Sequence, residues 1–348
     1  MSQNNFKEEL FNFNAGFNPF FLAEMNKIES GFHYNKITKD LLNKSFKFSR
    51  VGGKRLRPFM TFLGFNAIKE IDKANLNKVY YLGMVLELFH LYGLIHDDIL
   101  DDAQTRRGEI SIHNQYQDNF QGLQAAILAG DYLHTFVNRM FYQNFTSSSL
   151  QSLYMDMQNE VSAGQNDDSL GVGVEKLQEL KQENILNMLS LKSGLYSIQK
   201  PFLMGSCLAG EDLNSVRFKQ LATALEKLGL IFQITDDILG VFGNTTQTGK
   251  PEMGDIIERK RTLLVYKTYE FANSSEKQIL VDLYEKSNKK KAKEVFEIMH
   301  KYEIKQHTIN YCKTLEQKII LMLSTLDINN NIKTVLTNMT DYLIQRSG

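Results

Sequence analysis

The sequence predicts an all-α protein, and two observations lead to this fold class. Apolar residues recur at three- and four-residue spacing almost throughout, whereas the strict alternation that is typical of strands is rare. The 348 residues include only 4 prolines, and regular turn signals are few, which argues against an all-β fold. One such helical stripe is formed by Leu177, Leu180, Ile185, Met188 and Leu189.

The composition excludes several classes of protein. Hydrophobic residues make up 43 % of the chain, which argues against disorder. Lys+Arg and Asp+Glu balance at 40 each, which argues against nucleic-acid binding by bulk charge. Two cysteines, Cys207 and Cys312, are too few for a disulfide framework or a thiolate metal site, so we expect a reducing compartment.

Two long apolar segments predict helices that are buried on all sides. The first is 80–95, which is too short to span a bilayer and carries Glu87 and His90. The second is 214–238, and the chain beyond about Phe271 is Lys-rich and predicts peripheral helices over 271–348. We find no linker, signal peptide or lipidation motif, so we expect a single cytoplasmic domain over 1–348 with no membrane span.

An aspartate cluster follows the first buried helix, in the sequence HDDILDD. Asp97 and Asp101 lie four residues apart and so share one helix face, with Asp98 beside them. Adjacent carboxylates repel each other, so we expect a cation to compensate them. Hard oxygen ligands suit Mg²⁺, which commonly binds one or two carboxylates together with substrate phosphates. A solvated acidic helix end is the alternative.

A second pair favours the metal interpretation. Asp236 and Asp237 also end a long apolar helix, in QITDDIL, a sequence similar to LIHDDIL around the first pair. Divalent ions held by both pairs would bind a diphosphate. Basic residues that could clamp its oxygens lie in GGKRLRP, in the RRG that follows the first cluster, and at three later lysines. These residues are Lys54, Arg57, Arg106, Arg107, Lys192, Lys250 and Lys260.

Together these motifs resemble the trans-isoprenyl diphosphate synthases, also called polyprenyl synthetases. From about Gly52 to Thr262 the chain has GGKRLRP, HDDILDDAQTRRG, GQNDD, Lys192-Ser193, FQITDD and GKPEMGDIIERKRT, in the order typical of that family. Two positions depart from the pattern: Gly240 replaces the third aspartate of the second motif, and Ser193 replaces a threonine. The resemblance implies a helical bundle of the isoprenoid synthase type around a central cavity.

The resemblance also implies the reaction and its metal ions. An allylic diphosphate ionises, isopentenyl diphosphate attacks it head to tail, and a proton leaves. Three Mg²⁺ ions are expected to neutralise the leaving group. Asp97, Asp98 and Asp101 would bind two of them, Asp236 and Asp237 the third, and Asp168 would hold metal-bound water.

Further roles follow from the same resemblance. His90 lies seven residues before Asp97 and therefore on the same helix face. The implied ligands of the allylic diphosphate are Arg106, Lys192, Lys250 and Lys260; those of isopentenyl diphosphate are Lys54, Arg57, His90 and Arg107; Ser193 and Gln233 would flank the cation. A homodimer is expected by family analogy alone.

The length of the product is predicted from two rings that precede the first motif. Tyr92 lies five residues before Asp97, where an aromatic residue often closes the elongation tunnel in the family, and Phe89 lies one turn further away. At a rise of about 1.5 Å per residue these rings lie roughly 7 and 12 Å below the metals. The pattern resembles synthases of geranylgeranyl (C20) diphosphate, with farnesyl (C15) diphosphate next.

Other functions remain as alternatives at this point. A longer-chain synthase (C25 or above) differs only in its tunnel. A terpene cyclase or a head-to-head synthase does not need the basic GGKRLRP loop for a second diphosphate. A non-catalytic homologue that regulates a partner synthase would have lost aspartates or lysines, and this chain keeps nearly all of them.

Overall fold

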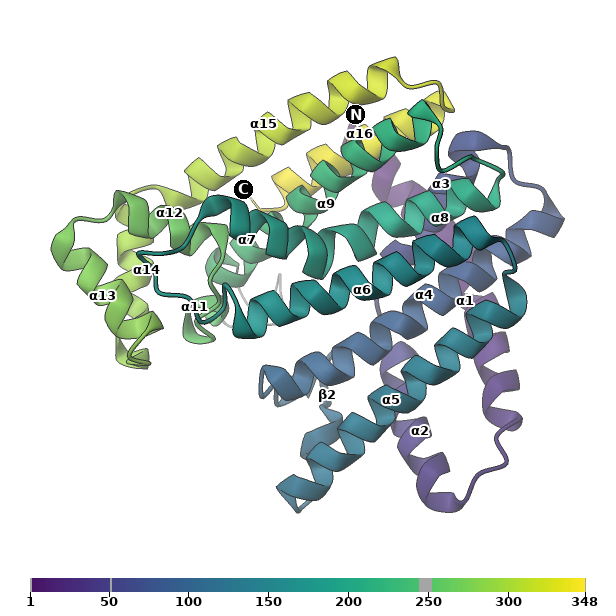
Figure 1. Ribbon diagram of the computed structural model, residues 1–348, viewed down its shortest axis with the longest axis horizontal. Helices are drawn as coiled ribbons and strands as arrows, with labels where there is room; N and C mark the ends of the chain where they lie inside the picture. The colour runs from purple at the N-terminus through teal and green to yellow at the C-terminus, as the bar shows by residue number, and fades with distance from the viewer. Residues whose placement is uncertain (1, 51, 244–251, 348) are drawn as a thin grey trace. The chain divides into compact units, whose positions relative to one another are not determined.

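The computed structural model describes residues 2–50, 52–243 and 252–347. They are overwhelmingly helical, which confirms the predicted fold class (Figure 1). Contacts divide the chain into two compact units. The N-terminal unit comprises 7–154 and 201–212, and the C-terminal unit comprises 1–6, 155–200 and 213–348. The chain passes several times between these units without a linker. That residues 1–348 form a single domain stays a prediction.

The N-terminal unit contains most of the first half of the chain. Three of its helices are divided between the units: α1 at its beginning, α6 beyond Tyr154, and α8, whose first residue Lys200 belongs to the other unit. The elements are α1 (Ser2–Ser30), α2 (Lys36–Arg50), α3 (Leu56–Ile68), α4 (Lys73–Leu100), β1 (Thr105–Arg106), β2 (Glu109–Ile110), the 3₁₀ helix η1 (Ile112–Gln115), α5 (Asn119–Asn144), the start of α6 (Ser148–Leu170) and α8 (Lys200–Leu208).

The central helix of this unit is α4, which packs against α3 and α5 (Figure 1). Asp72 caps its first turn by accepting a hydrogen bond from the backbone N–H of Asn75 at 2.8 Å. Asp118 caps α5 in the same way through Gln121 at 2.7 Å. Val79, Leu82 and most residues that follow are buried, as predicted from the apolar segment 80–95. The caps and the apolar run therefore explain why this helix forms and where it lies.

α4 is longer than the apolar segment that predicted it. Its 28 residues make it the one helix, within the part of the chain that the structure describes, with the length and composition to cross a membrane. The apolar segment 80–95 is therefore one part of a helix that is long enough to span a bilayer. Most of the apolar window is buried inside the protein, however, as in the core helix of a globular protein, so the indication of a membrane span is weak.

A short hairpin follows α4 and positions the two arginines. β1 pairs antiparallel with β2, with Arg106 opposite Glu109. Arg107 and Gly108 form the two-residue turn, with φ of 53° and 81°. Such a turn needs positive φ at both positions, which glycine adopts readily. The backbone thus reverses directly after the aspartate motif, so Arg106 is returned toward the end of α4.

The C-terminal unit is built around α9. Ser215 caps α9 by accepting from the backbone N–H of Phe218 at 2.9 Å. The elements are the rest of α6, α7 (Gln182–Leu189), the π-helix η2 (Ser190–Gln199), α9 (Val216–Phe242), α11 (Gly254–Ile257), α12 (Leu263–Phe271), α13 (Ser274–Tyr284), the 3₁₀ helix η3 (Lys289–Lys291), α14 (Ala292–Lys301), α15 (Ile304–Thr325) and α16 (Asn330–Gln345).

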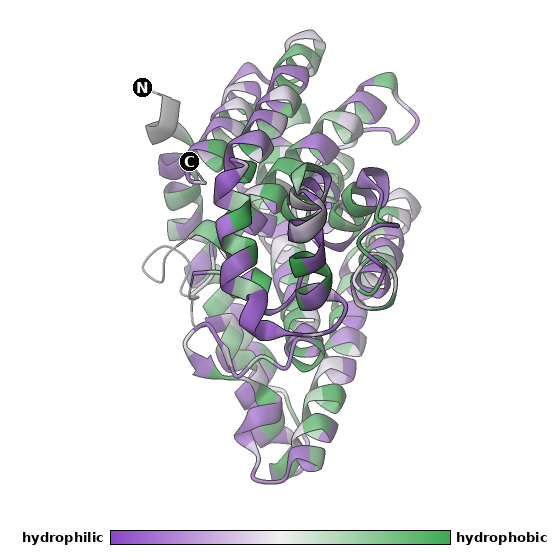
Figure 2. Cartoon of the chain, turned by 90° about the vertical axis from the view of Figure 1, so that its left-hand side faces the viewer, coloured by the Kyte–Doolittle hydropathy of each residue, from purple (hydrophilic) through white to green (hydrophobic). Residues whose placement is uncertain are grey.

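Helices from both sides cover α9. It packs against η2, α15 and α16, and the approach to η2 is close because glycines meet there. A Cβ on Gly194 would lie 2.9 Å from the backbone carbon of Gly229, so neither position has room for a side chain. Figure 2 shows hydrophobic and hydrophilic residues alternating along the helices, as expected of helices with one buried face. The C-terminal helices thus pack directly on the helix that carries the second aspartate pair.

Candidate active site

The first aspartate motif lies where α4 ends, in the N-terminal unit. Asp98 is buried, with 3 % of its surface exposed, whereas Asp101 follows the last helical residue and is exposed. Arg106 donates from Nε to Asp98 Oδ1 at 2.7 Å, and its Nη2 lies 3.6 Å from Asp97 Oδ2. Burial raises the pKa of Asp98, while the hydrogen bond from Arg106 opposes that shift. The structure therefore joins Arg106 to two aspartates of this motif.

Arg107 fastens the glycine-rich basic loop to this motif. Its Nη1 donates to the carbonyl oxygens of Phe48 at 2.7 Å and Gly52 at 3.2 Å. A Cβ at Gly53 would lie 3.3 Å from the guanidinium, and the φ of Gly53 is 117°. The loop thus needs glycine both for its backbone conformation and for the approach of the arginine.

The basic residues of the loop differ in their surroundings. Lys54 is exposed, whereas Arg57 is buried, with 9 % of its surface exposed. Arg55 points into the protein, where its Nη1 donates to Glu87 Oε2 at 3.0 Å and its Nη2 to the Ser49 carbonyl at 2.7 Å. Both members of the Arg55–Glu87 pair are about 5 % exposed, so this pair holds the loop against α4. The prediction that basic residues of this loop bind isopentenyl diphosphate therefore concerns Lys54 and Arg57 and not Arg55.

His90 faces a strongly basic environment on α4. Desolvation lowers its pKa well below the usual value, and the charges of Arg57, Arg107, Arg106 and Arg55 lower it further. The imidazole is therefore neutral at pH 7. A neutral His90 presents one donor and one acceptor to an anion that the surrounding arginines attract.

The two rings predicted to limit product length lie in an aromatic cluster between α4 and α5. The Tyr92 ring centroid lies 5.4 Å from that of Phe89 and 4.9 Å from that of His134 on α5. Phe89 also contacts Tyr154, with ring centroids 6.3 Å apart. Burial raises the pKa of Tyr92. The cluster braces both rings from neighbouring helices, which is what a rigid barrier requires.

The second aspartate motif lies near the end of α9, in the C-terminal unit. Asp237 is buried, and its Oδ1 accepts a hydrogen bond from Gln233 Nε2 at 2.7 Å. Its Oδ2 is buried with no hydrogen-bond donor among the residues that the structure describes. Desolvation raises the pKa of Asp237 well above its usual value, and the charge of Asp255 raises it further. Gln233 therefore orients this carboxylate.

Asp255 on α11 is a site residue that the sequence reasoning did not single out. A Cβ placed on Gly240 would overlap the Asp255 carboxylate, so Asp255 lies directly over this glycine. Gly240 is the position at which the family pattern has its third aspartate. A carboxylate from the next helix thus lies beside the place where the motif lacks one. The departure at Gly240, together with GD in the following loop, was the available signal.

Lys192 and Ser193 lie on the π-helix η2. Lys192 forms an ion pair with Asp168 of α6, and a Cβ on Gly164 would overlap the backbone of Lys192. π-Helical turns are rare and concentrate at functional sites. GQNDD and Lys-Ser, separated in the sequence, are therefore brought together as one pair of charges.

The remaining lysines lie near α11. Lys260 forms an ion pair with Glu258 at 2.8 Å, and its Nζ lies 3.7 Å from Asp255 Oδ1. This contact brings Lys260 close to the second aspartate motif. Lys250, by contrast, lies outside the described residues.

The carboxylates suit a hard divalent cation that takes only some of its ligands from the protein, rather than a metal held by protein ligands alone. In 2–50, 52–243 and 252–347 no three His, Cys, Asp or Glu side chains gather closely enough to hold a metal by themselves. The buried Asp237 Oδ2 offers an acceptor that a metal or its water would satisfy. Few protein ligands, with the rest supplied by water and phosphate, is the coordination typical of Mg²⁺.

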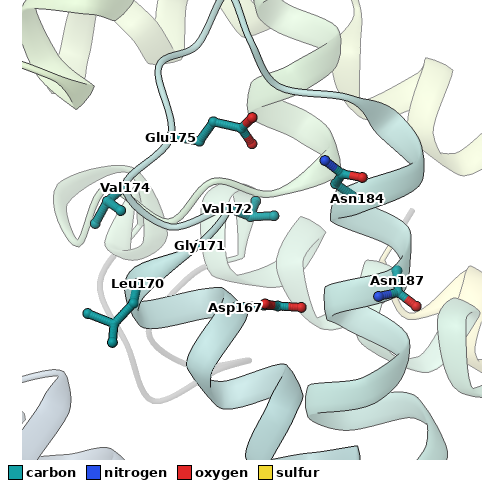
Figure 3. A pocket seen from close by; sticks show the side chains of 8 residues that line it. All are labelled: Asp167, Leu170, Gly171, Val172, Val174, Glu175, Asn184 and Asn187. Atoms are coloured by element: carbon teal, nitrogen blue, oxygen red, sulfur yellow. The ribbon is translucent and has the colours of Figure 1, made fainter.

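A hollow of about 460 Å³ opens beside α6 and α7 in the same unit (Figure 3). The Asp167 side chain points toward Asn187 of α7 in this view, and the loop after α6 forms the other wall. The hollow is lined by Asp167, Leu170, Gly171, Val172, Val174, Glu175, Asn184 and Asn187. It therefore belongs to the surface around that loop and not to the predicted site residues.

Near the end of each of two buried helices lies an acidic pair that binds an arginine. Such acidic and basic groups together indicate a helical enzyme for anionic substrates. The family model described as polyprenyl synthetase matches residues 39–302. The geranylgeranyl diphosphate synthase of Sulfolobus acidocaldarius is 31 % identical over 283 residues, 80 % of this chain and 81 % of the relative. The geranylfarnesyl diphosphate synthase of Aeropyrum pernix is 33 % identical over 246 residues, 67 % of this chain and 71 % of the relative.

A solved structure shares the fold. Geranylgeranyl pyrophosphate synthase from Corynebacterium glutamicum, crystallised with isoprenyl diphosphate and magnesium, superposes with a TM-score of 0.80 at 23 % identity, covering 99 % of this chain and 100 % of that one. The chain belongs to the polyprenyl synthetase family and is a prenyltransferase. The resemblance that the motifs indicated is therefore confirmed.

Proposed function

We propose that this protein condenses isopentenyl diphosphate head to tail with an allylic diphosphate to make a short-chain, all-trans prenyl diphosphate. The observation that carries the proposal is the aspartate pair at the end of each buried helix, α4 and α9, each with a bound basic partner. Membership of the polyprenyl synthetase family supports it. A non-catalytic homologue is not favoured, since the charged residues of every motif are present.

The reaction breaks the allylic C–O bond, and the electron pair leaves with diphosphate. The double bond of isopentenyl diphosphate then forms the new C–C bond with the allylic carbon, and a proton is lost to the departing diphosphate. Bound Mg²⁺ supplies neutralisation of the leaving group. We propose three ions, two held by Asp97, Asp98 and Asp101 and one by Asp236 and Asp237.

The basic residues divide between the two substrates in this proposal. Arg106, Lys192 and Lys260 each contact a carboxylate in the structure and would exchange it in part for the allylic diphosphate. Lys250 is assigned to the same substrate by its place in the motif. Lys54, Arg57, Arg107 and neutral His90 lie in the N-terminal unit and would hold isopentenyl diphosphate. Ser193 and Gln233 would direct their dipoles at the cation, with Asp168 holding metal-bound water.

The proposed products are geranylgeranyl (C20) and, next, farnesyl (C15) diphosphate. The aromatic cluster around Tyr92 and Phe89 supports a short product, because rings packed from α4 and α5 resist displacement by the growing chain. The Sulfolobus acidocaldarius relative is named for the C20 product. The Aeropyrum pernix relative is named for geranylfarnesyl (C25) diphosphate. A C25 product therefore remains the alternative.

Assembly and location belong to the same proposal. A homodimer is proposed by family analogy, and light scattering of the purified chain tests it. A cytoplasmic location is supported by two free thiols, Cys207 and Cys312, which suit a reducing compartment. Fractionation of cells that express the chain tests the location.

Incubation with labelled isopentenyl diphosphate, Mg²⁺ and allylic primers of increasing length tests the function. We expect Mg²⁺-dependent transfer of label to primer, with products resolved by chromatography after dephosphorylation. Cyclic or head-to-head products would indicate another class of enzyme. Absence of turnover with every primer would contradict the proposal.

A further inference from the structure

The last described arginine of the chain reaches the second aspartate motif. Arg346 directly follows α16, and its Nη2 forms an ion pair with Asp236 Oδ1. The same nitrogen lies 3.3 Å from Thr235 Oγ1, and the guanidinium carbon lies 5.7 Å from the Phe232 ring centroid. The side chain of Arg346 is only 11 % exposed. Three residues of α9 therefore contact this arginine.

Packing holds Arg346 in this place. α16 lies against α9, and Leu343, Ile344 and Ser347 are buried on either side of the arginine. The backbone N–H of Arg346 donates to the Tyr342 carbonyl at 3.0 Å, which continues the helix geometry to this point. A packed helix thus places the guanidinium against Asp236, although the two residues lie 110 positions apart in the sequence.

The ion pair has a consequence for metal binding. A guanidinium on Asp236 Oδ1 competes with Mg²⁺ for this carboxylate, because a metal ion bound there would meet a second positive charge at close range. Asp237 next to it is oriented by Gln233, a neutral group. Asp236 is therefore paired with an arginine, a side chain that stays positively charged at every physiological pH.

We propose that Arg346 is a positioning residue that occupies Asp236 until a divalent metal displaces it, and so weakens metal binding by the second motif. The inference rests on the proposed function in taking Asp236 as a metal ligand. It makes the C-terminal helix a determinant of the Mg²⁺ concentration at which the enzyme works. The guanidinium also holds the Asp236 side chain in one position in the metal-free protein.

The sign of one substitution separates this role from a structural one. Removing the arginine charge with Arg346→Gln should tighten metal binding at least about threefold, the scale of a partly exposed ion pair. A merely structural arginine would give the opposite sign, because loosening α16 would disorder the ligands. Arg346→Lys keeps the cation and should retain most of the wild-type affinity.

The measurement is titration of the full-length protein with Mn²⁺ alone, following the free ion by electron paramagnetic resonance. Arg217→Gln is the matched control, because Arg217 pairs with Asp327 at the surface of the same unit. Asp236→Asn removes the proposed ligand, so Arg346→Gln should add nothing in that background. Circular dichroism checks that each variant folds.

Unchanged or weaker Mn²⁺ binding in folded Arg346→Gln, compared with Arg217→Gln, would overturn the inference. So would an equal gain in the Asp236→Asn background. Because no substrate is present, the result is independent of product formation. A chain that shows the gain but makes no prenyl product would contradict only the proposed function.

Discussion

Individual side chains at the site are set by partners that the local sequence does not reveal. Of the basic residues in GGKRLRP, Arg55 turns inward to Glu87, while Lys54 stays exposed. Arg106 and Arg107 are adjacent, yet one binds the aspartates and the other binds backbone carbonyls of the loop. Charge type and spacing predicted which motifs matter, but not which protein groups each of two neighbouring arginines binds.

His90 predicts a pH dependence of stability. Its pKa is lowered in the folded state, so below the unfolded pKa of about 6.5 the unfolded chain binds the proton and folding loses stability. Between pH 7.5 and 5.5 the wild type should lose up to about 1.4 kcal/mol more than His90→Gln. Urea unfolding at both pH values measures this, with exposed His33→Gln as control. Equal pH dependence in wild type and His90→Gln would show that folding does not lower the pKa of His90.

Arg57 and Lys192 should separate the two substrates. Arg57→Ala should raise the KM for isopentenyl diphosphate by about tenfold or more, since it removes a charged hydrogen-bond donor. Lys192→Ala should lower kcat by about 10² or more, because it removes stabilisation of the leaving group. Steady-state kinetics with each substrate varied measure both effects.

Surface Lys47→Ala, which breaks only the pair with Glu109, is the control for these variants. A KM for isopentenyl diphosphate that stays at the wild-type value in folded Arg57→Ala would show that the assignment of substrates is wrong.

At the scale of elements, periodicity predicted the two buried helices but not their special turns. α4 and α9 lie where the apolar segments place them, and their ends carry the aspartates. The π-helix η2 was not predicted, because π-helices are rare and are defined by i→i+5 backbone hydrogen bonds, which side-chain type does not reveal. The hairpin after α4 was also missed, since each strand has only two residues.

The aromatic cluster on α4 predicts how products lengthen. Tyr92→Ala, alone and with Phe89→Ala, should open the path beside α4 and shift products beyond those of the wild type. Phe89 is buried, and its truncation costs about 3–5 kcal/mol, so Tyr92→Ala is the variant that keeps the test informative. Chromatography of the dephosphorylated products measures chain length.

Tyr81→Ala removes a ring from the same helix further from the aspartates and should leave the products unchanged. An unaltered product distribution in Tyr92→Ala/Phe89→Ala would refute the barrier, as would a wild type that already makes C30 and longer products.

At the scale of the whole molecule, the residues missed by sequence reasoning are those that act across long separations. Arg346 meets Asp236 across 110 residues, and no local pattern marks it. Asp255 meets Gly240 only because α11 folds back on α9. The aspartate motifs were found because each lies at the end of a long apolar segment. Local order is therefore readable from the sequence, whereas partnership between distant helices requires the fold.

The central claim is that both aspartate motifs serve one metal-dependent reaction, although they lie in different units. The most direct measurement is the turnover of Asp97→Ala and Asp236→Ala, each with Mg²⁺ and both substrates. Exposed Asp40→Ala and Asp327→Ala serve as controls, one in each unit. We predict that each motif variant loses turnover while its far-UV helicity stays intact, since it loses a ligand and not a core contact. Near-normal turnover in either variant would contradict the claim.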